Sequence, residues 1–402
     1  MTQRIDGTAF ISGSFLSEAS ILIDGDTITY AGPESALPSE LNADEHVRHD
    51  GLILPGLVDI HCHGGGGFSF PDTEDPAQAA PAIAEHRAHG TTSIVASLVT
   101  AAQDTLMSRV RALRSLVEAG ELAGIHLEGP FISHARKGAH DPQFIAEGDA
   151  ARTLALLEAG GGTIATMTIA PEADLDGSVS RALIAHGALP SYGHTDCTGE
   201  QMVTAIQRAH EELASVGPVA RSTKPTATHL FNAMRPIHHR DAGPAFAAID
   251  QAAAGTVVAE LIADGVHTSA DTVRYTFDLI TDGHIMLITD AMAATGMADG
   301  DYVLGSLPVT VKDGVATLTE GGAIAGGTAH LLDVVRFAHL EAGVSLERAV
   351  LAATATPARV LGRRGIGEIR EGARADLALV SAEGLEAERV MHAGEWFSSD
   401  AS

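Results

Sequence analysis

Short apolar runs alternate with longer amphipathic stretches through the middle of this chain. Runs of this length, rich in Val, Ile, Leu and Thr, are typical of buried strands, and the stretches between them have helical character. Eight runs are expected to be strands: Leu57–His61, Thr91–Leu98, Gly124–Glu128, Thr163–Ile169, Leu189–His194, Ala227–Phe231, Val257–Ala263 and Ile285–Asp290. The helices predicted between them are Ala77–Ala88, Gln103–Glu118, Ala150–Glu158, Gly199–Glu212 and Ala270–Leu279.

Strands that alternate with helices predict a parallel sheet. Eight such units that close on themselves would form a TIM barrel, whose usual size is about 250 residues. The alternative is an open, doubly wound sheet. No Gly-x-Gly-x-x-Gly opens a helix after the first run, which weakens that alternative. The chain is therefore expected to be an α/β protein with a (β/α)8 TIM barrel.

Both ends of the chain have a different pattern, of short strands separated by turns. Asp24-Gly25 lies between two apolar runs and indicates a hairpin, and the tail contains two more strand-like segments, 375–380 and 388–391. We expect these ends to join in a small β-sandwich of residues 1–51 and 364–402, with the barrel in residues 52–363. A second hairpin, 309–318, is predicted as an insertion before two last helices, 331–340 and 346–361.

A His-x-His pair ends the first run of the barrel pattern. Residues two apart on a strand point to the same side, so His61 and His63 should converge at the end of the strand. Histidine is the commonest metal ligand, and this pair suits zinc or a similar divalent ion. The alternative is that these are two unrelated histidines, since the chain has 20.

Polar, metal-capable residues also end several of the other runs. Reactive residues of a TIM barrel lie at the carboxyl ends of its strands, so such residues should meet at the barrel mouth. They are Glu128, His194, His229 and Asp290, with His267 shortly after the seventh run. A barrel mouth lined in this way indicates a metal-dependent hydrolase.

The chemistry of such a mouth suggests roles for its residues. A divalent ion lowers the pKa of a bound water toward about 7, and a nearby carboxylate can take its proton and later give it to the leaving group. Asp290, after the last strand, is the candidate for that acid/base. His61 and His63 could hold a second ion, with Glu128 bridging the two.

Several motifs, in order along the chain, resemble the N-acetylglucosamine-6-phosphate deacetylases, a family of the amidohydrolase superfamily. The motifs are DIHCHG, HLEGPF with KGAHDP, GHTD, THLFNAM, ADGVH, TDAMAATG and IAGG, followed by the tail GIGEIREGARADLALV. The resemblance covers nearly the whole chain. It implies metal-dependent hydrolysis of N-acetyl-D-glucosamine 6-phosphate to D-glucosamine 6-phosphate and acetate.

The resemblance also implies roles for individual residues. Glu128, His194 and His229 would be the main metal ligands, Asp290 the catalytic acid/base, and His140 a hydrogen-bond donor to the acetyl carbonyl. The residues implied in the sugar pocket are Ala139, Asn232, Ala233, Ile324, Ala325 and Gly326. Arg240 and His267 would hold the phosphate, and Arg240 would reach across the interface of a homodimer.

The expected cofactor is a divalent metal, with zinc first and iron, manganese or cobalt as alternatives. Some members of the family lack the His-x-His pair and carry one metal, so its presence here favours two ions per chain. Other members of the superfamily bridge their metals with a carboxylated lysine. No lysine lies in 163–169, so Glu128 would be the bridge.

Composition adds limits on partners and location. The 402 residues carry a formal charge of −27, which argues against nucleic acid or anionic membrane as a partner and requires local cations for an anionic substrate. The start of the chain lacks a signal-peptide pattern, and we expect a cytoplasmic protein. Two other functions remain open: an amidohydrolase for another N-acyl amine or cyclic amide, and a non-catalytic binder of metal or sugar phosphate.

Overall fold

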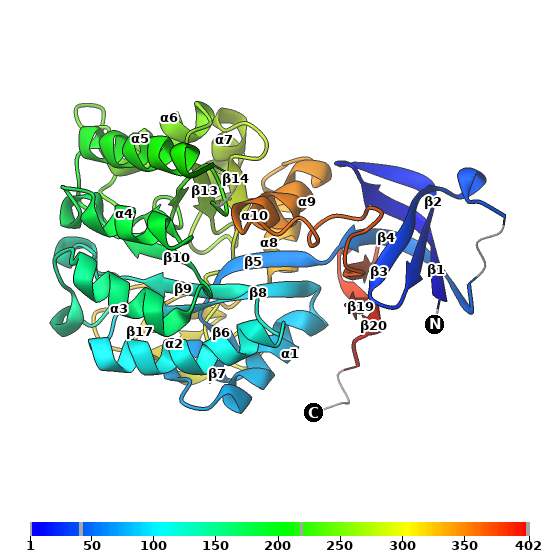
Figure 1. The fold of residues 1–402 in the computed structure, drawn as a ribbon, viewed down its shortest axis with the longest axis horizontal. Coiled ribbons are helices and arrows are strands. Elements are labelled where there is room, and N and C mark those ends of the chain that lie inside the picture. The colour runs from blue at the N-terminus through cyan, green and yellow to red at the C-terminus, as the bar shows by residue number, and fades with distance from the viewer. Residues whose placement is uncertain (1, 40–42, 218–219, 399–402) are drawn as a thin grey trace.

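The computed structural model describes residues 2–39, 43–217 and 220–398. It consists of a barrel of parallel strands surrounded by helices and a separate sheet built from both ends of the chain (Figure 1). The predictions of a (β/α)8 barrel and of terminal strands that join each other are confirmed.

The barrel strands are arranged in the order in which they occur in the chain, and each pairs in parallel with the next. They are β5 (Leu57–Cys62), β8 (Thr91–Val99), β9 (Gly124–Glu128), β10 (Ile164–Ile169), β11 (Leu189–Tyr192), β12 (Thr226–Ala227), β13 (Val258–Leu261) and β14 (Ile285–Leu287). The segment after β14 closes the barrel onto β5. Asp290 N donates to His61 O at 2.9 Å and His63 N to Ala291 O at 2.7 Å.

One helix follows each barrel strand and covers the outside. These helices are α1 (Ala80–Ala88), α2 (Gln103–Glu118), α3 (Ala150–Gly160), α4 (Ser178–Ala185), α5 (Gly199–Val216), α6 (Gly243–Ala253), α7 (Ala270–Leu279) and α8 (Leu331–Arg336). Every residue of β8 is buried, because such a strand has the barrel interior on one face and helices on the other.

The last barrel strands are shorter than the sequence pattern predicted. Of the run expected over 227–231, only Ala227 is in a strand, the two-residue β12, and the run expected to reach Asp290 ends as a strand at Leu287. His229, Phe231 and Asp290 have φ values of 25°, 79° and 51°. These values are incompatible with a strand, so the ends of both runs are loops above the barrel.

The helices expected after the insertion are also interrupted. The helix predicted over 331–340 changes at Phe337 into a π-helix, Phe337–Glu341. The helix predicted over 346–361 is divided at Thr354 into α9 (Leu346–Ala353) and α10 (Ala355–Val360). Pro357 has no N–H to bond the carbonyl four residues earlier, and the break at Thr354 places it in the first turn of α10, where none is needed.

The terminal sheet contains seven strands in the order β20-β19-β18-β4-β1-β2-β3. They are β1 (Thr2–Ile11), β2 (Ser14–Asp24), β3 (Thr27–Pro33), β4 (Glu45–Pro55), β18 (Leu377–Val380), β19 (Ala387–His392) and β20 (Glu395–Trp396). The predicted hairpin at Asp24-Gly25 is present as the turn between β2 and β3. The edge strand β3 is bonded to the segment that leads into β18, since Ile28 N donates to Ala373 O at 2.9 Å. The domain limits 1–51, 52–363 and 364–402 stay a prediction, and β4 continues past the first of them.

A buried carboxylate in the terminal sheet yields a test of its stability. Asp6, on β1, is fully buried and accepts from Arg4 Nε at 2.8 Å, Ser20 Oγ at 2.6 Å and His46 Nε2 at 2.6 Å. Burial alone would raise the pKa of Asp6, but these hydrogen bonds lower it. Its stabilising contribution is therefore present above its ordinary pKa of about 4 and is lost as the pH falls through the lower, folded-state value.

We expect Asp6→Asn to lower the free energy of unfolding at pH 7 by about 1.5–3 kcal/mol, because hydrogen bonds to a charged group are lost. The difference from wild type should shrink below about pH 4. Urea denaturation at both pH values measures it, with the exposed Asp24→Asn as the control. Equal losses in the two variants at pH 7 would contradict the expectation.

An additional sheet is inserted between β14 and α8. It consists of β15 (Gly300–Leu304), β16 (Leu307–Lys312) and β17 (Val315–Leu318), of which the last two form the hairpin predicted over 309–318. Its turn residues Asp313 and Gly314 have φ values of 52° and 72°, which match the turn type that two-residue hairpins favour. The sheet packs with Val99 and Met292 near the barrel mouth.

The remaining elements are short. They are strands β6 (Gly64–Gly65) and β7 (Phe68–Ser69) and the 3-10 helices Glu34–Ala36, Phe70–Asp72, Pro76–Ala79, His134–Arg136, Pro142–Phe144 and Pro171–Ala173. Among the helices of the described residues, none combines the length and apolar character needed to cross a lipid bilayer.

Candidate active site

The predicted polar residues meet at one end of the barrel. His61 and His63 lie at the end of β5 and Glu128 is the last residue of β9. His194, His229 and Asp290 follow β11, β12 and β14. The five potential ligands and Asp290 are buried or nearly buried, as expected for a site inside the barrel mouth.

Three of these residues have a left-handed backbone conformation that is uncommon outside glycine. The φ values of His194, His229 and Asp290 are 47°, 25° and 51°. Such conformations cost free energy and persist where the surroundings enforce them, which occurs often at active sites. Here the left-handed turn directs each side chain from its strand end toward the centre of the mouth.

Glu128, His194 and His229 form the first of two compact groups of ligand atoms. Glu128 Oε1 lies 3.0 Å from His194 Nε2 and 2.9 Å from His229 Nε2, and the two Nε2 atoms are 3.0 Å apart. Ligands bound tetrahedrally to zinc at 2.0–2.1 Å are about 3.3 Å from each other. The spacing of the three atoms is thus close to that of a metal's ligand shell.

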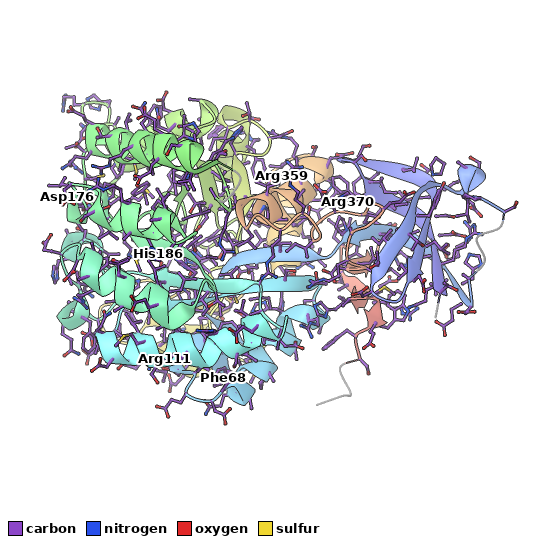
Figure 2. The ribbon with its side chains drawn as sticks, in the orientation of Figure 1. Phe68, Arg111, Asp176, His186, Arg359 and Arg370 are labelled. Carbon is purple, nitrogen blue, oxygen red and sulfur yellow. The ribbon has the colours of Figure 1, made fainter. Side chains whose placement is uncertain are left out.

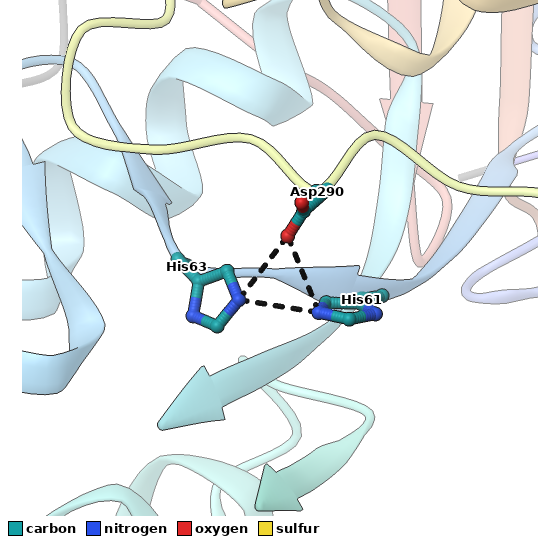
Figure 3. Close-up of side chains that lie close together, drawn as sticks. All are labelled: His61, His63 and Asp290. Carbon is teal, nitrogen blue, oxygen red and sulfur yellow. Dashed lines mark hydrogen bonds and ion pairs between the residues drawn. The ribbon is translucent and has the colours of Figure 1, made fainter. Parts of the chain in front are cut away.

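The second group consists of His61, His63 and Asp290 (Figure 3). Both imidazoles point their Nε2 atoms at the Asp290 carboxylate, with 3.1 Å between the two nitrogens and 3.3 Å and 3.2 Å from them to Asp290 Oδ1. Glu128 connects the groups, because its Oε2 lies 3.3 Å from His63 Nε2 while its Oε1 belongs to the first group. This is the position of a bridging carboxylate.

Hydrogen bonds on the far side of three rings orient them as ligands. The Nδ1 atoms of His61, His63 and His194 face acceptors: Glu260 Oε2 at 3.0 Å, Ser97 O at 3.2 Å and Arg136 O at 2.9 Å. Nδ1 therefore carries the proton in each neutral ring, and Nε2 keeps a lone pair directed into the site. The Nδ1 of His229 is buried without a partner among the described residues.

His140 has the opposite orientation of donor and acceptor. Thr100 N donates to its Nδ1 at 3.2 Å, so the proton of the neutral ring is on Nε2, 3.1 Å from Glu128 Oε2. His140 also lies within a metal-capable group with Glu128 and His194. However, a protonated Nε2 cannot ligate, so the geometry suits a hydrogen-bond donor aimed at the site.

The residues present fit a divalent metal. Unprotonated Nε2 atoms facing each other at 3.0–3.1 Å cannot hydrogen-bond, and a cation between them removes their repulsion. Imidazole and carboxylate donors are the set that zinc prefers, and iron, manganese and cobalt accept it. Glu128, His194 and His229 would hold one ion, and His61 and His63 a second.

Electrostatics shows the same need for positive charge at the centre. Burial alone would lower the pKa of His61, but the charges of Asp290, Glu260 and Glu128 raise it to about 10. Burial would raise the pKa of Asp290, yet His61 and His63 hold it well below its usual range. Without a metal, protons on the imidazoles thus balance the carboxylates, and a bound ion would replace those protons.

A cavity of about 240 Å³ opens directly above these groups. Of the residues implied in substrate binding, it is lined by Ala139, His140, Asn232, Ala233, His267, Ile324 and Gly326. Leu304 and Ala323 show that the inserted sheet and the loop after it contribute one wall. Ala325 is fully buried beside this wall, and Arg240 is exposed and does not line the cavity of its own chain.

His267 lines the cavity beside a carboxylate, Asp264. Its Nδ1 lies 2.7 Å from Asp264 Oδ2, and only 4% of its side chain is exposed. Burial alone would lower the pKa of His267, but the hydrogen bond and the charge of Asp264 raise it. A protonated ring with Nε2 free to donate is suited to a phosphate at the rim of the cavity.

Two buried acids that support the site were missed in the sequence. Glu260, on β13, accepts from His61 Nδ1 and from His229 N at 3.1 Å. Asp59, on β5, accepts from Thr289 Oγ1 at 2.5 Å and from His61 N at 3.2 Å, which connects β5 to the turn before Asp290. The signal was present, since each acid interrupts an otherwise apolar run.

The two groups of ligands predict the metal stoichiometry. We expect two divalent ions per wild-type chain and about one in His61→Asn, because the first group of ligands is unchanged in this variant and an amide is a weak replacement for imidazole. Elemental analysis of the purified proteins measures this, with the exposed His134→Asn as the matched control. One ion in both wild type and His61→Asn would show that the pair does not hold a second ion.

Comparison with known proteins agrees with the geometry. The profile of the amidohydrolase family matches residues 52–397. N-acetylglucosamine-6-phosphate deacetylase of Bacillus subtilis is 31% identical over 369 residues, covering 89% of this chain and 86% of the relative. N-acetylgalactosamine-6-phosphate deacetylase of a Shewanella species is 28% identical, covering 92% and 90%.

A solved structure extends the similarity to the whole fold. It is a variant of N-acetyl-D-glucosamine-6-phosphate deacetylase from Mycobacterium smegmatis in complex with N-acetyl-D-glucosamine 6-phosphate. It is 38% identical, with a TM-score of 0.88 over 98% of both chains. The chain therefore belongs to the amidohydrolase family and, within it, to the N-acetylglucosamine-6-phosphate deacetylases.

Proposed function

We propose that this protein hydrolyses N-acetyl-D-glucosamine 6-phosphate to D-glucosamine 6-phosphate and acetate. The observation that carries the proposal is the convergence of two groups of ligand atoms on one carboxylate, Glu128, beside the Asp290 carboxylate and the Nε2–H of His140. This arrangement suits the hydrolysis of an amide, in which a water must be deprotonated and a carbonyl polarised.

When bound, the divalent ions would polarise the amide carbonyl and activate the water. Asp290 accepts a proton from the attacking water and then delivers it to the amide nitrogen as the C–N bond breaks, so that acetate and the free amine leave. His140 donates a hydrogen bond from Nε2 to the acetyl oxygen, where negative charge develops. The left-handed turn orients Asp290 for proton transfer, and the hydrogen bond from Thr100 orients His140 for donation.

The sugar phosphate is recognised by groups around the cavity. Ala139, Asn232, Ala233 and the loop Ile324–Gly326 surround the sugar, and His267 binds the phosphate through its Nε2. Arg240 is exposed on the loop after His229. We propose that it completes the cavity of a second chain in a homodimer. The cytoplasmic location, like the absence of a nucleic-acid or membrane partner, stays a prediction.

Acetate release from a set of substrates tests the proposal. We expect the fastest release from N-acetylglucosamine 6-phosphate, weaker release from N-acetylglucosamine, and loss of both after removal of metal with a chelator. Faster release from N-acetylgalactosamine 6-phosphate would favour the activity named for the Shewanella relative. Binding of these sugar phosphates without acetate release would indicate a non-catalytic binder.

A further inference from the structure

Basic side chains gather in a large cavity at the end of the barrel opposite the active site. The cavity measures about 1430 Å³ and lies where the segments before β12 and β14 meet residues 356–370. Segments that precede the strands lie at their amino ends, whereas the metal-capable residues lie at their carboxyl ends. Figure 2 labels Arg359 and Arg370 in this region, between the barrel and the terminal sheet.

The charge of this cavity is opposite to that of the chain as a whole. It is lined by Arg221, Lys224, Arg359, Arg363, Arg364 and Arg370, but among the described residues its lining contains only two acids, Asp282 and Glu368. The full chain has 25 Lys and Arg against 52 Asp and Glu. A cavity lined by one sign of charge attracts ions of the opposite sign, so this cluster of cations in an acidic chain indicates a site for an anion.

Both acids are already paired with arginines: Asp282 with Arg348, outside the lining, and Glu368 with two arginines of the lining. Asp282 Oδ1 lies 2.6 Å from Arg348 Nε, and Glu368 lies 3.0 Å from Arg370 and 3.5 Å from Arg359. Within the described ranges, no carboxylate therefore neutralises the remaining cations, Arg221, Lys224, Arg363 and Arg364.

Two of these cations, Arg221 and Lys224, contact uncharged acceptors. Arg221 donates to the carbonyls of Gly187 at 2.7 Å and Gly162 at 2.6 Å, and Lys224 Nζ contacts His284 Nε2. These contacts orient the side chains without removing their charge.

The backbone keeps two of these cations next to each other. Gly362 has a φ of +68°, and a Cβ there would lie 2.8 Å from Arg221 O, so this loop packs directly on the backbone of Arg221. Burial lowers the pKa of Arg221, and the charge of Arg363 lowers it further. Burial likewise lowers the pKa of Arg363. A bound anion would remove this repulsion and replace the lost hydration.

We propose that this basic cavity binds a small phosphorylated anion, with Arg221, Arg363 and Arg364 as its main contacts. The guanidinium fork matches two phosphate oxygens, and its charge is retained when water is excluded. The volume exceeds that of one phosphate, which leaves space for the sugar or nucleoside of a phosphate ester. This site is separate from the phosphate position of the proposed substrate and would exist whether or not the proposed activity is correct.

Titration calorimetry of the full-length, metal-loaded protein with inorganic phosphate at low ionic strength tests the proposal. We expect Arg363→Gln to weaken binding at this site by about tenfold or more, the effect of losing one charge-assisted contact. Arg364→Gln, a change at an exposed position, should also weaken it. Arg111→Gln removes the same charge from the exposed surface of α2 and should leave affinity unchanged (Figure 2).

Thermal unfolding separates binding from a structural role. Without phosphate, Arg363→Gln should melt at or above the temperature of wild type, because the repulsion with Arg221 is gone. Phosphate should then raise the melting temperature of wild type more than that of the variant. A lower melting temperature of the variant with an unchanged phosphate response would overturn the proposal.

Phosphate bound only in the active site gives a different result. Its affinity would persist in both Arg363→Gln and Arg364→Gln and fall in a His267 variant, and that outcome would also overturn the proposal. Repeating the titration with glucose 6-phosphate and adenosine 5′-monophosphate identifies which phosphate ester the basic cavity accepts. If Arg363→Gln does not fold, the phosphate affinity of the exposed Arg364→Gln tests the proposal instead.

Discussion

Asp290→Asn should abolish turnover while both metal and substrate still bind. An amide has the size of the carboxylate but cannot take a proton from water and return it to the amine. We expect kcat to fall by about a thousandfold or more, with little change in KM. Steady-state acetate release measures the loss, and elemental analysis together with binding of the sugar phosphate shows that the site is intact.

The control for Asp290→Asn is an acid that has no contact with the site. Asp301→Asn, on the exposed face of β15, removes the same charge from the inserted sheet and should retain wild-type kcat. Turnover of Asp290→Asn near that of wild type would exclude Asp290 as the proton carrier. Loss of metal in Asp290→Asn would instead show that Asp290 acts mainly as a ligand beside His61 and His63.

Arg240→Ala should raise KM for the phosphorylated substrate by about ten- to a hundredfold and leave kcat nearly unchanged. Arg240 is exposed, and its guanidinium forms no hydrogen bond or ion pair with the described residues. Activity on unphosphorylated N-acetylglucosamine is the internal control, because that substrate offers no phosphate. Equal losses on the two substrates would refute a role for Arg240 in phosphate binding.

Mixed dimers test whether Arg240 acts across an interface. If Arg240 completes the partner's cavity, a dimer of one Arg240→Ala chain and one Asp290→Asn chain has one site with both defects and one intact site. Activity at low substrate should then recover on subunit exchange. Absence of recovery, with exchange proven by labelled chains, would place Arg240 in the site of its own chain.

The alternation of apolar runs and helical stretches was sufficient to predict the barrel and most of its element positions. The bounds of β9, α2 and α7 agree with the prediction, because each has a clear period and a clear end. Helix α6 was not predicted, because 8 of its 11 residues are buried and it lacks a polar face. The buried residues are Gly243, Pro244, Ala245, Ala247, Ala248, Ile249, Gln251 and Ala252. The period of a helix cannot be recognised when most of its surface faces the core.

The ends of the late strands could not be predicted for a different reason. The left-handed φ values at His229 and Asp290 end the strand conformation there, and an apolar run does not reveal such a turn. The prediction of one continuous helix over 346–361 was wrong for a similar reason, because only the fold decides whether Pro357 kinks a helix or begins a new one.

The candidate site was predictable in its residues more than in their chemistry. Strand ends indicated which polar side chains meet, and the resemblance added His140 and the residues of the sugar pocket. The proton on Nε2 of His140 depends on Thr100 N, a contact between residues 40 positions apart. The supporting acids Asp59 and Glu260 were hidden for the same reason, since their partners are known only from the fold.

The closure of the barrel has a consequence for when activity begins during synthesis. Asp290 is held between the first and last parts of the barrel: its N–H donates to His61 O, and its carbonyl accepts from Gly327 N at 2.7 Å. All five metal-capable ligands leave the ribosome before Asp290, and Gly327 follows only after the inserted sheet. A nascent chain that ends before Gly327 therefore contains all five ligands but lacks one of the two backbone hydrogen bonds that hold Asp290. We expect the proposed hydrolysis to begin only once this closure is complete.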